Sequence, residues 1–182
     1  MMLGAYLTFR VFVRGAYLTH GRVTAFPLFL EFLICGLYCN FPYLYLPFEW
    51  PLLPILSQPA LLLIPGLGLI GLGVVLLVAG MASLGLPRLL GLASPGVYQQ
   101  GVYRISRNPQ IVGFFLYAVG FAVLWPSWYA LGWLLLFIPT FHMMILTEEE
   151  FLLKVHGEAY RAYCESVPRY IRFWPRLNQA TT

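Results

Sequence analysis

Hydrophobic residues fall into long uncharged runs separated by short polar stretches. Residues 60–86 carry no charged side chain and are rich in Leu, Ile and Val. A helix needs about 20 apolar residues to cross the hydrocarbon core of a bilayer. Residues 109–147 are also uncharged, but a Trp-Pro-Ser-Trp stretch at 125–128 combines a turn signal with interfacial aromatics. The pattern predicts spans at about 60–86, 109–125 and 128–147, the last two joined by a tight helical hairpin.

A fourth predicted span, at about 26–46, is interrupted by Glu31 and by a proline in its second half. Residues 1–22 are also largely apolar but contain Arg10 and Arg14, one helical turn apart. Two arginines near the centre of a span cost about 5 kcal/mol or more on insertion scales. We therefore predict that residues 1–22 form an amphipathic helix in the membrane interface.

Composition supports a membrane protein. Of the 182 residues, 60% are hydrophobic and only 10% are charged, whereas soluble domains average roughly 25% charged residues. The mean hydropathy is +0.76, which excludes an ordinary soluble domain and a disordered chain. The sequence predicts one integral membrane domain over 1–182, an all-α transmembrane helical bundle of about four spans with a C-terminal cytoplasmic helical segment at 148–182.

The basic residues predict the orientation in the membrane. They precede the first span, follow the second and follow the fourth, while the loops at 47–59 and 126–127 contain none. The positive-inside rule then places both termini and the loop at 87–108 in the cytoplasm, in a multi-pass protein. The net charge of +4 reflects these loops. Because no basic run is interleaved with aromatics, no nucleic-acid partner is expected.

The glycines and cysteines are interpreted as packing residues and not as parts of a catalytic or metal site. Gly66, Gly73 and Gly80 recur at seven-residue intervals, a stripe that lets another helix approach closely. The three cysteines, Cys35, Cys39 and Cys164, have no metal-ligand or disulfide spacing and are interpreted as structural thiols. The chain contains no Asp and no Gly-x-Ser-x-Gly, which argues against a hydrolytic triad. No metal site is predicted.

The first candidate site segment, residues 101–110, opens the third span. It contains Arg104, Arg107, Asn108 and Gln110, with a proline at the first helical position and Asn108 in place to act as an N-cap. A cytoplasmic anchor with an ordinary cap is one interpretation. A binding site is the other, since an anchor does not require uncharged amides.

The second segment places Glu148, Glu149 and Glu150 directly after the fourth span. Carboxylates are unfavourable at a helix C-terminus, so we expect the helix to continue into the cytosol. The three residues form either a solvated acidic turn or a site in which one or two of them face a cation. The tight hairpin brings them close to Arg107, which suits a ligand that carries both signs of charge.

These two segments resemble the integral-membrane methyltransferases that include isoprenylcysteine carboxyl methyltransferase and the phospholipid N-methyltransferases. The family pattern is Gly-x-Tyr and Arg-His-Pro-x-Tyr-x-Gly, then a helical hairpin, Glu-Glu-x-x-Leu, Phe-Gly-x-x-Tyr-x-x-Tyr and a Val-Pro-Arg-like end. The agreement covers about residues 96–175. The matching residues are Gly101, Tyr103, Arg107, Pro109, Gly113, Glu148, Glu149, Leu152, Gly157, Tyr160, Tyr163, Val167 and Pro168.

The chain departs from this pattern at three positions. Asn108 replaces the histidine, Ile111 the first tyrosine and His156 the phenylalanine. An asparagine cannot take up a proton, so a histidine base at this position is excluded. Because carboxylate and thiolate acceptors need no base, this substitution favours an anionic acceptor.

The resemblance implies methyl transfer from S-adenosylmethionine, bound on the cytoplasmic side, to a lipophilic acceptor entering from the bilayer. Arg107 and Asn108 are the expected catalytic residues, and His142 and Arg169 are expected to contact the acceptor. The expected cofactor-binding residues are Tyr103, Arg104, Gln110, Glu148, Glu149, Tyr160 and Tyr163.

The sequence leaves the chemical class of the methyl acceptor undecided. An isoprenylcysteine carboxylate is the preferred expectation, with the amine of an ethanolamine phospholipid or a small thiol as alternatives. Membrane sterol reductases, which use NADPH, share similar C-terminal features and are a more distant alternative. A non-catalytic membrane scaffold would bind neither cofactor.

Overall fold

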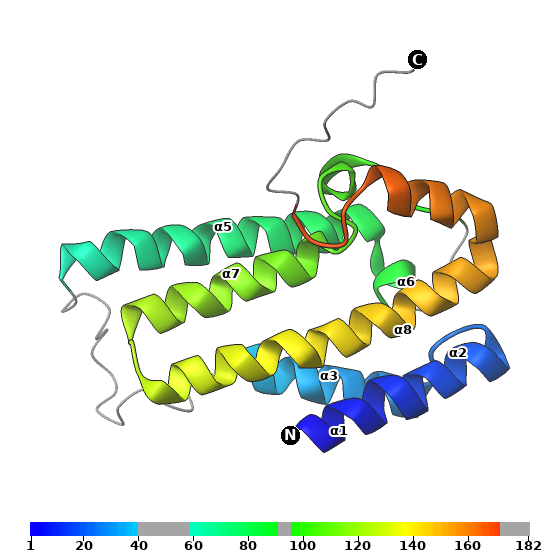
Figure 1. The fold of residues 1–182 in the computed structure, drawn as a ribbon, viewed down its shortest axis with the longest axis horizontal. Helices are drawn as coiled ribbons and strands as arrows, with labels where there is room; N and C mark the ends of the chain where they lie inside the picture. The colour runs from blue at the N-terminus through cyan, green and yellow to red at the C-terminus, as the bar shows by residue number, and fades with distance from the viewer. Residues whose placement is uncertain (40–58, 91–95, 172–182) are drawn as a thin grey trace, which may run out of the picture.

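The computed structural model describes residues 1–39, 59–90 and 96–171. These residues are helical or irregular and contain no strand, which confirms the all-α prediction. In chain order the helices are α1 (Met2–Tyr6), the π-helical segment η1 (Leu7–Val13), α2 (Arg14–His20), α3 (Ala25–Cys39), α5 (Ala60–Leu84), α6 (Leu86–Leu89), the 3-10 turn η3 (Gly101–Arg104), α7 (Pro109–Leu124) and α8 (Trp128–Ser166) (Figure 1). The second half of the predicted span at 26–46, nearly all of the loop at 47–59 and the tail from 172 lie outside the described residues.

The apolar helices begin and end within a few residues of the predicted spans. α5, predicted at about 60–86, ends at Leu84, where Gly85 has a φ of 73° that few other residues adopt. α7 has a proline at its first position. The turn between α7 and α8 is as tight as expected, and the Ser127 hydroxyl caps α8 by accepting a hydrogen bond from the Ala130 N–H (3.1 Å).

Two described helices, α5 and α8, are long and apolar enough to cross a membrane, and α3 and α7 are shorter apolar helices. The outward faces of these helices carry large apolar side chains, as lipid contact requires. On α3, α5 and α8 these include Phe26, Phe29, Leu61, Ile64, Val75, Leu135 and Ile138. Four spans stays a prediction from the sequence.

Glycines allow α5 and α7 to pack backbone against backbone. A Cβ atom on Gly73 would lie 2.5 Å from the Tyr117 nitrogen and 2.6 Å from the Gly113 oxygen. A Cβ on Gly120 would likewise lie 2.8 Å from the Gly66 oxygen. Such distances are not tolerated between real atoms, so these positions require glycine. The helix partner expected for the glycine stripe is therefore α7.

α8 continues well beyond the predicted span, as the acidic segment indicated. It kinks at Gly157, whose φ of 50° and ψ of −122° lie outside the helical region. After the kink the chain turns back towards the start of α7 (Figure 1). The kink therefore brings the second motif block over the first.

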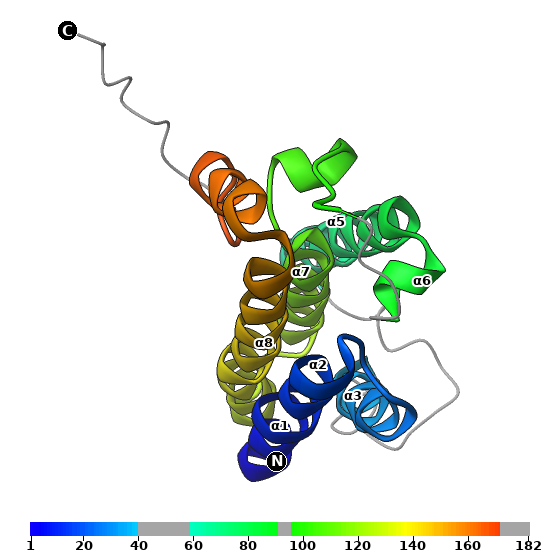
Figure 2. The ribbon, with the colours of Figure 1, turned by 90° about the vertical axis from the view of Figure 1, so that its right-hand side faces the viewer.

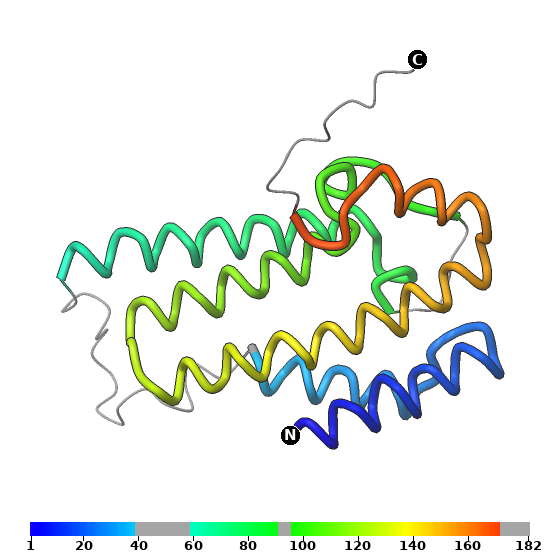
Figure 3. Tube along the Cα trace, viewed as in Figure 1, coloured from blue at the N-terminus to red at the C-terminus, as the bar shows by residue number. Residues whose placement is uncertain are grey.

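The N-terminal helices α1 to α2 form one continuous rod that runs alongside α8, with α3 returning antiparallel to it (Figure 3). Viewed along the bundle, α2 and α3 lie below α5 and α7, and α8 runs along one side of both pairs (Figure 2). Buried aromatics join these layers: the ring centroid of Phe141 lies 5.2 Å from those of Tyr38 and Phe114. The placement of this rod in the membrane interface stays a prediction.

Candidate functional site

A cavity of about 450 Å³ lies where α3, α5, α6, α7 and α8 meet the loop at 96–108. All the expected catalytic and cofactor-binding residues except Arg104 line it. They are Tyr103, Arg107, Asn108, Gln110, Glu148, Glu149, Tyr160 and Tyr163. Helix packing and the Gly157 kink thus bring together two motif blocks that are about 40 residues apart in the sequence.

The three consecutive glutamates point in three directions, because each residue of a helix is rotated by about 100° from the last. Glu148 lines the cavity. Glu149 binds Arg169 (2.6 Å between Nη2 and Oε2) and Arg107 (3.2 Å between Nη1 and Oε1). Glu150 faces away from the cavity.

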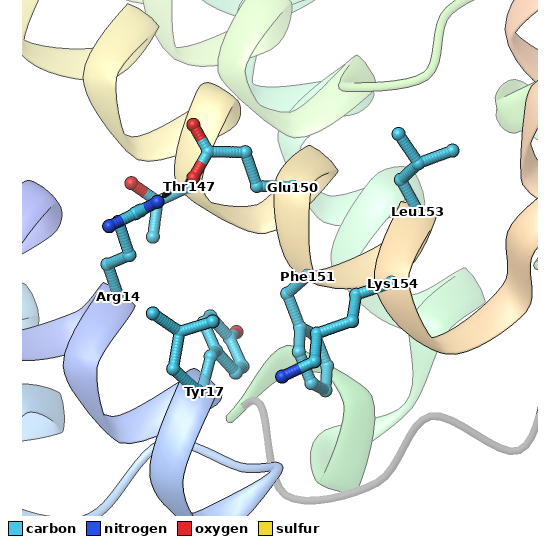
Figure 4. Close-up of a pocket in the computed structure, with 8 residues that line it drawn as sticks. Arg14, Tyr17, Thr147, Glu150, Phe151, Leu153 and Lys154 are labelled. Atoms are coloured by element: carbon cyan, nitrogen blue, oxygen red, sulfur yellow. Dashed lines mark hydrogen bonds and ion pairs between the residues drawn. The ribbon is translucent and has the colours of Figure 1, made fainter.

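Glu150 instead fastens the N-terminal rod to α8. Its Oε1 lies 2.8 Å from Nη2 of Arg10, and its Oε2 lies 2.7 Å from Nε of Arg14. Figure 4 shows Arg14 and Glu150 beside a groove of about 330 Å³ between α2 and α8. Next to them the buried Thr147 hydroxyl donates to the Phe9 carbonyl (3.1 Å). These contacts hold the wall of the cavity that the N-terminal helices supply.

Tyrosines tie the loop before α7 to its surroundings. The Tyr163 hydroxyl donates to the Tyr103 carbonyl (2.7 Å), and the Tyr103 hydroxyl donates to Oε1 of Gln110 (2.6 Å). The backbone N–H of Arg107 donates to the Pro168 carbonyl (2.9 Å). The end of α8 and the segment that follows it therefore close the cavity by docking on this loop.

Asn108 contributes to the same closure. It stands directly before α7, as predicted, but its side chain does not cap the helix. Instead, its Nδ2 donates to the Arg169 carbonyl (3.1 Å), and its own N–H donates to the Ser106 hydroxyl (3.1 Å). The expectation of a side-chain N-cap was wrong: the hydrogen bond from Nδ2 orients the amide towards the docked C-terminal segment, and its oxygen accepts no N–H of the first helical turn.

Polar groups in the cavity lack hydrogen-bond or ion-pair partners among the described residues. The Arg107 side chain is 10% exposed and its Nε has no hydrogen-bond partner within the described chain, although Nη1 contacts Glu149 and Cys164. Burial raises the pKa of Glu148 to about 8, helped by the charges of Glu31 and Glu149. An unsatisfied guanidinium N–H and a carboxyl group without a cation in one cavity indicate a ligand that supplies both partners.

Three of the expected site residues lie outside this cavity lining. Arg104 is exposed on η3. His142 shares a hydrogen bond with the Tyr170 hydroxyl (2.7 Å). Arg169 reaches the site through its ion pair with Glu149 and through its carbonyl, which accepts the hydrogen bond from Asn108.

Other cavity residues were not expected from the sequence. Tyr17 and Glu31 come from the N-terminal helices, and Arg88 and Tyr98 come from the segment after α5. The Arg88 guanidinium lies 5.4 Å from the centre of the Tyr98 ring, and its Nε is buried without a partner in the described residues. The one available signal was Glu31, a charge within an apolar span, which was interpreted only as weakening that span.

The fold and the site define a class: an all-helical membrane protein with a polar cavity at one end of its helical hairpin. Residues 61–159, more than half of the chain, match the phospholipid methyltransferase family, and the chain belongs to this family. Comparison with curated proteins and with solved structures finds no match. Family membership makes the protein a membrane-associated methyltransferase and favours this activity over an NADPH-dependent reductase.

Proposed function

We propose that this protein transfers a methyl group from S-adenosylmethionine to a lipophilic acceptor that enters the cavity from the bilayer. The observation that supports this most is the cavity itself, which gathers both motif blocks around a free carboxyl group and an unsatisfied guanidinium. The cofactor carries an ammonium, a sulfonium and a carboxylate, so its charges match this donor set.

The residues divide into those that meet the cofactor and those that shape its site. Glu148 faces the ammonium, since among the described residues no hydrogen bond or ion pair engages its carboxyl group. The Nε of Arg107 is available to the carboxylate. Tyr160 and Gln110 line the space left for the nucleoside. When bound, the cofactor supplies a methyl group on a positively charged sulfur, activated for in-line transfer.

Asn108, Arg169 and Tyr163 act as positioning residues. Their hydrogen bonds hold the loop before α7 against the segment after α8, so the cavity walls are fixed before a ligand enters. Fixed walls favour transfer because alignment and exclusion of water account for much of the acceleration in group transfer.

The acceptor is a lipid or lipid-like molecule. Asn108 replaces the histidine of the family pattern, and this favours an isoprenylcysteine carboxylate as the acceptor. The description of the matched family, phospholipid methyltransferase, favours a phospholipid acceptor instead. In either case we propose a multi-pass protein with both termini in the cytoplasm, where S-adenosylmethionine is available.

Cofactor binding tests this proposal with a matched pair of variants. Purified protein in mild detergent is titrated with S-adenosylmethionine by calorimetry. Glu148→Gln should weaken binding by about tenfold or more, the usual effect of losing a hydrogen bond to a charged group. Glu150→Gln should bind like the wild type, because the neighbouring Glu150 carboxylate faces Arg10 and Arg14 outside the cavity.

Two further measurements separate the alternatives. NADPH should not raise the melting temperature of the protein, whereas S-adenosylmethionine should. When membranes are incubated with methyl-labelled cofactor and then fractionated, the label should be incorporated into the lipid fraction. Stabilisation by NADPH alone would support a reductase, and no response to either molecule would contradict an enzyme of either kind.

A further inference from the structure

The groove of about 330 Å³ between α2 and α8, here called the α2–α8 groove, is separate from the cavity but shares a wall with it. Tyr17 and Phe151 line both spaces. Their rings are stacked, with centroids 4.1 Å apart and planes 14° from parallel, so this pair stands between the groove and the cavity. The volume of the groove is at the lower end of the range of small-molecule sites. The proposed methyl transfer does not use this space.

Basic groups outnumber acidic groups in the α2–α8 groove. Arg14 and Lys154 line it together with one carboxylate, that of Glu150. Both oxygens of this carboxylate are already engaged, Oε1 by Arg10 and Oε2 by Arg14. The carboxylate is therefore more than neutralised, and the groove keeps an excess of positive charge.

The basic groups of the groove have donors left for a ligand. Arg14 uses only its Nε on Glu150, and its two terminal nitrogens contact no acceptor within the described chain. The Lys154 ammonium has no hydrogen bond or ion pair among the described residues. Figure 4 shows the Lys154 side chain extending from α8 towards α2. A guanidinium and an ammonium from two helices suit a phosphate, whose oxygens accept several charge-assisted hydrogen bonds.

The position of the groove along α8 matches the headgroup layer of a bilayer. On α8 the groove runs from Thr147 to Lys154, which is about 10 Å of helix. The predicted fourth span ends at about 147, and the headgroup layer on each side of the hydrocarbon core is about 5–8 Å thick. The arginine distribution predicts that this end of the bundle is cytoplasmic, and anionic lipids give the cytoplasmic leaflet its negative surface.

The rim of the groove is apolar and open. Leu18 on α2 and Leu153 on α8 both line the groove, and they are 50% and 39% exposed. The Arg14 side chain is 45% exposed, so a molecule from outside can reach it. An anionic head between apolar rims is the arrangement that a phospholipid fits, whereas a free phosphate would leave the leucines in water.

We propose that the α2–α8 groove binds the phosphate of an anionic phospholipid from the cytoplasmic leaflet, as a structural ligand and not as a methyl acceptor. The phosphate links Arg14 of the N-terminal rod to Lys154 of α8, and so adds to the contact that Glu150 already makes between them. A zwitterionic lipid is disfavoured, because its cation would lie beside these basic groups. The inference does not depend on the proposed methyl transfer.

Lipid binding to the full chain in mild detergent tests the proposal. Native mass spectrometry measures how much phosphatidylglycerol is retained relative to phosphatidylcholine, and the wild type should prefer phosphatidylglycerol. Lys154→Gln should lower this preference about fivefold, the usual effect of one basic residue near an anionic lipid. Arg14→Gln should lower it too, but this change also removes an ion pair that holds α2. Lys154→Gln removes no contact between described residues, so it is the variant that decides.

The control is Arg161→Gln, which removes the same charge further along α8 at a side chain that is 63% exposed and outside the groove. It should retain lipid like the wild type. Phosphatidylglycerol should also raise the melting temperature of the wild type more than that of Lys154→Gln, because the lipid joins two helices.

Four outcomes would overturn the proposal. The first is a wild type that retains the two lipids equally. The second is an equal loss of preference in Lys154→Gln and Arg161→Gln, which would show only a general effect of surface charge. The third is displacement of the lipid by millimolar glycerol 3-phosphate, which would identify a soluble phosphate as the ligand. The fourth is a loss of affinity for S-adenosylmethionine in Lys154→Gln, which would assign this residue to the cavity.

Discussion

At the scale of single residues, the direction of a side chain decides its role more than its identity does. Glu148, Glu149 and Glu150 are chemically identical, yet one lines the cavity, one neutralises two arginines and one anchors the N-terminal rod. The rotation of about 100° per helical residue separates them. Only the first of the three is left for a cationic ligand.

The raised pKa of Glu148 predicts a pH dependence of stability. The pKa is about 8 in the folded protein and 4.5 as the reference value for an unfolded chain. Between these values the unfolded chain has lost a proton that the folded chain still holds, so the free energy of unfolding should fall as the pH rises. Thermal unfolding of the ligand-free protein in mild detergent, from pH 4.5 to pH 9, measures this fall.

Glu148→Gln should show a smaller fall over the same range. The other groups that face Glu148 are Glu31, Glu149, Tyr17 and Tyr103. They are present in both proteins, so their contributions largely cancel in the comparison. The pKa of Glu150 is lowered by its hydrogen bond to Arg14, which makes Glu150→Gln a control that acts only at the acidic end. Equal pH slopes in the wild type and Glu148→Gln would contradict the prediction.

At the scale of elements, the contact between α5 and α7 sets the position of the first motif block. α7 carries Asn108 and Gln110 at its start, and a Cβ atom on Gly80 would lie 3.1 Å from the Gln110 nitrogen. The glycines therefore place the start of α7, and with it one side of the cavity, close to the end of α5.

Gly73→Ala should destabilise this pair by roughly 1–3 kcal/mol, the usual cost of overpacking. The new methyl group would meet backbone atoms of Tyr117 and Gly113, which cannot move without shifting a helix. Gly71→Ala is the matched control, because nothing lies within 4 Å of the position of its Cβ. Thermal unfolding of both variants decides the question, and equal melting temperatures would show that α7 does not pack on this stripe.

At the scale of the whole molecule, the polar groups gather at one end of the bundle. The α7–α8 turn lies at the opposite end from the Gly157 kink (Figure 1). The arginine distribution predicts that the end with the kink is cytoplasmic, the side on which the proposed cofactor S-adenosylmethionine is available.

Cysteine labelling tests this orientation. In a variant whose native cysteines are replaced by serine, Trp128→Cys and Glu158→Cys place a thiol at the turn and just after the kink. Both native side chains are strongly exposed. A membrane-impermeant maleimide should label the thiol at 158 only from the cytoplasmic side and the thiol at 128 only from the other side. Labelling of both from one side would contradict the predicted topology.

The sequence by itself determined the helical class, the bounds of α5 and α7, the tight hairpin and the continuation of α8. These features depend on local patterns: uncharged runs, a proline at a helix start, the Trp-Pro-Ser-Trp turn signal and the run of glutamates after the last span. The tight hairpin also predicted that Arg107 lies close to the glutamates at 148–150, because it aligns the start of one helix with the far part of the next; the structure shows this contact for Glu149.

Only the tertiary structure decided which charged and polar side chains pair with one another and which face the cavity. Glu149 pairs with Arg107 and Arg169 because the Gly157 kink folds the end of α8 back over the loop before α7. Asn108 binds the docked segment after α8 instead of capping α7. Glu31 reaches the cavity because the N-terminal rod packs along α8 and carries α3 with it. Each of these contacts joins residues far apart in the chain, and local sequence patterns do not encode such distances.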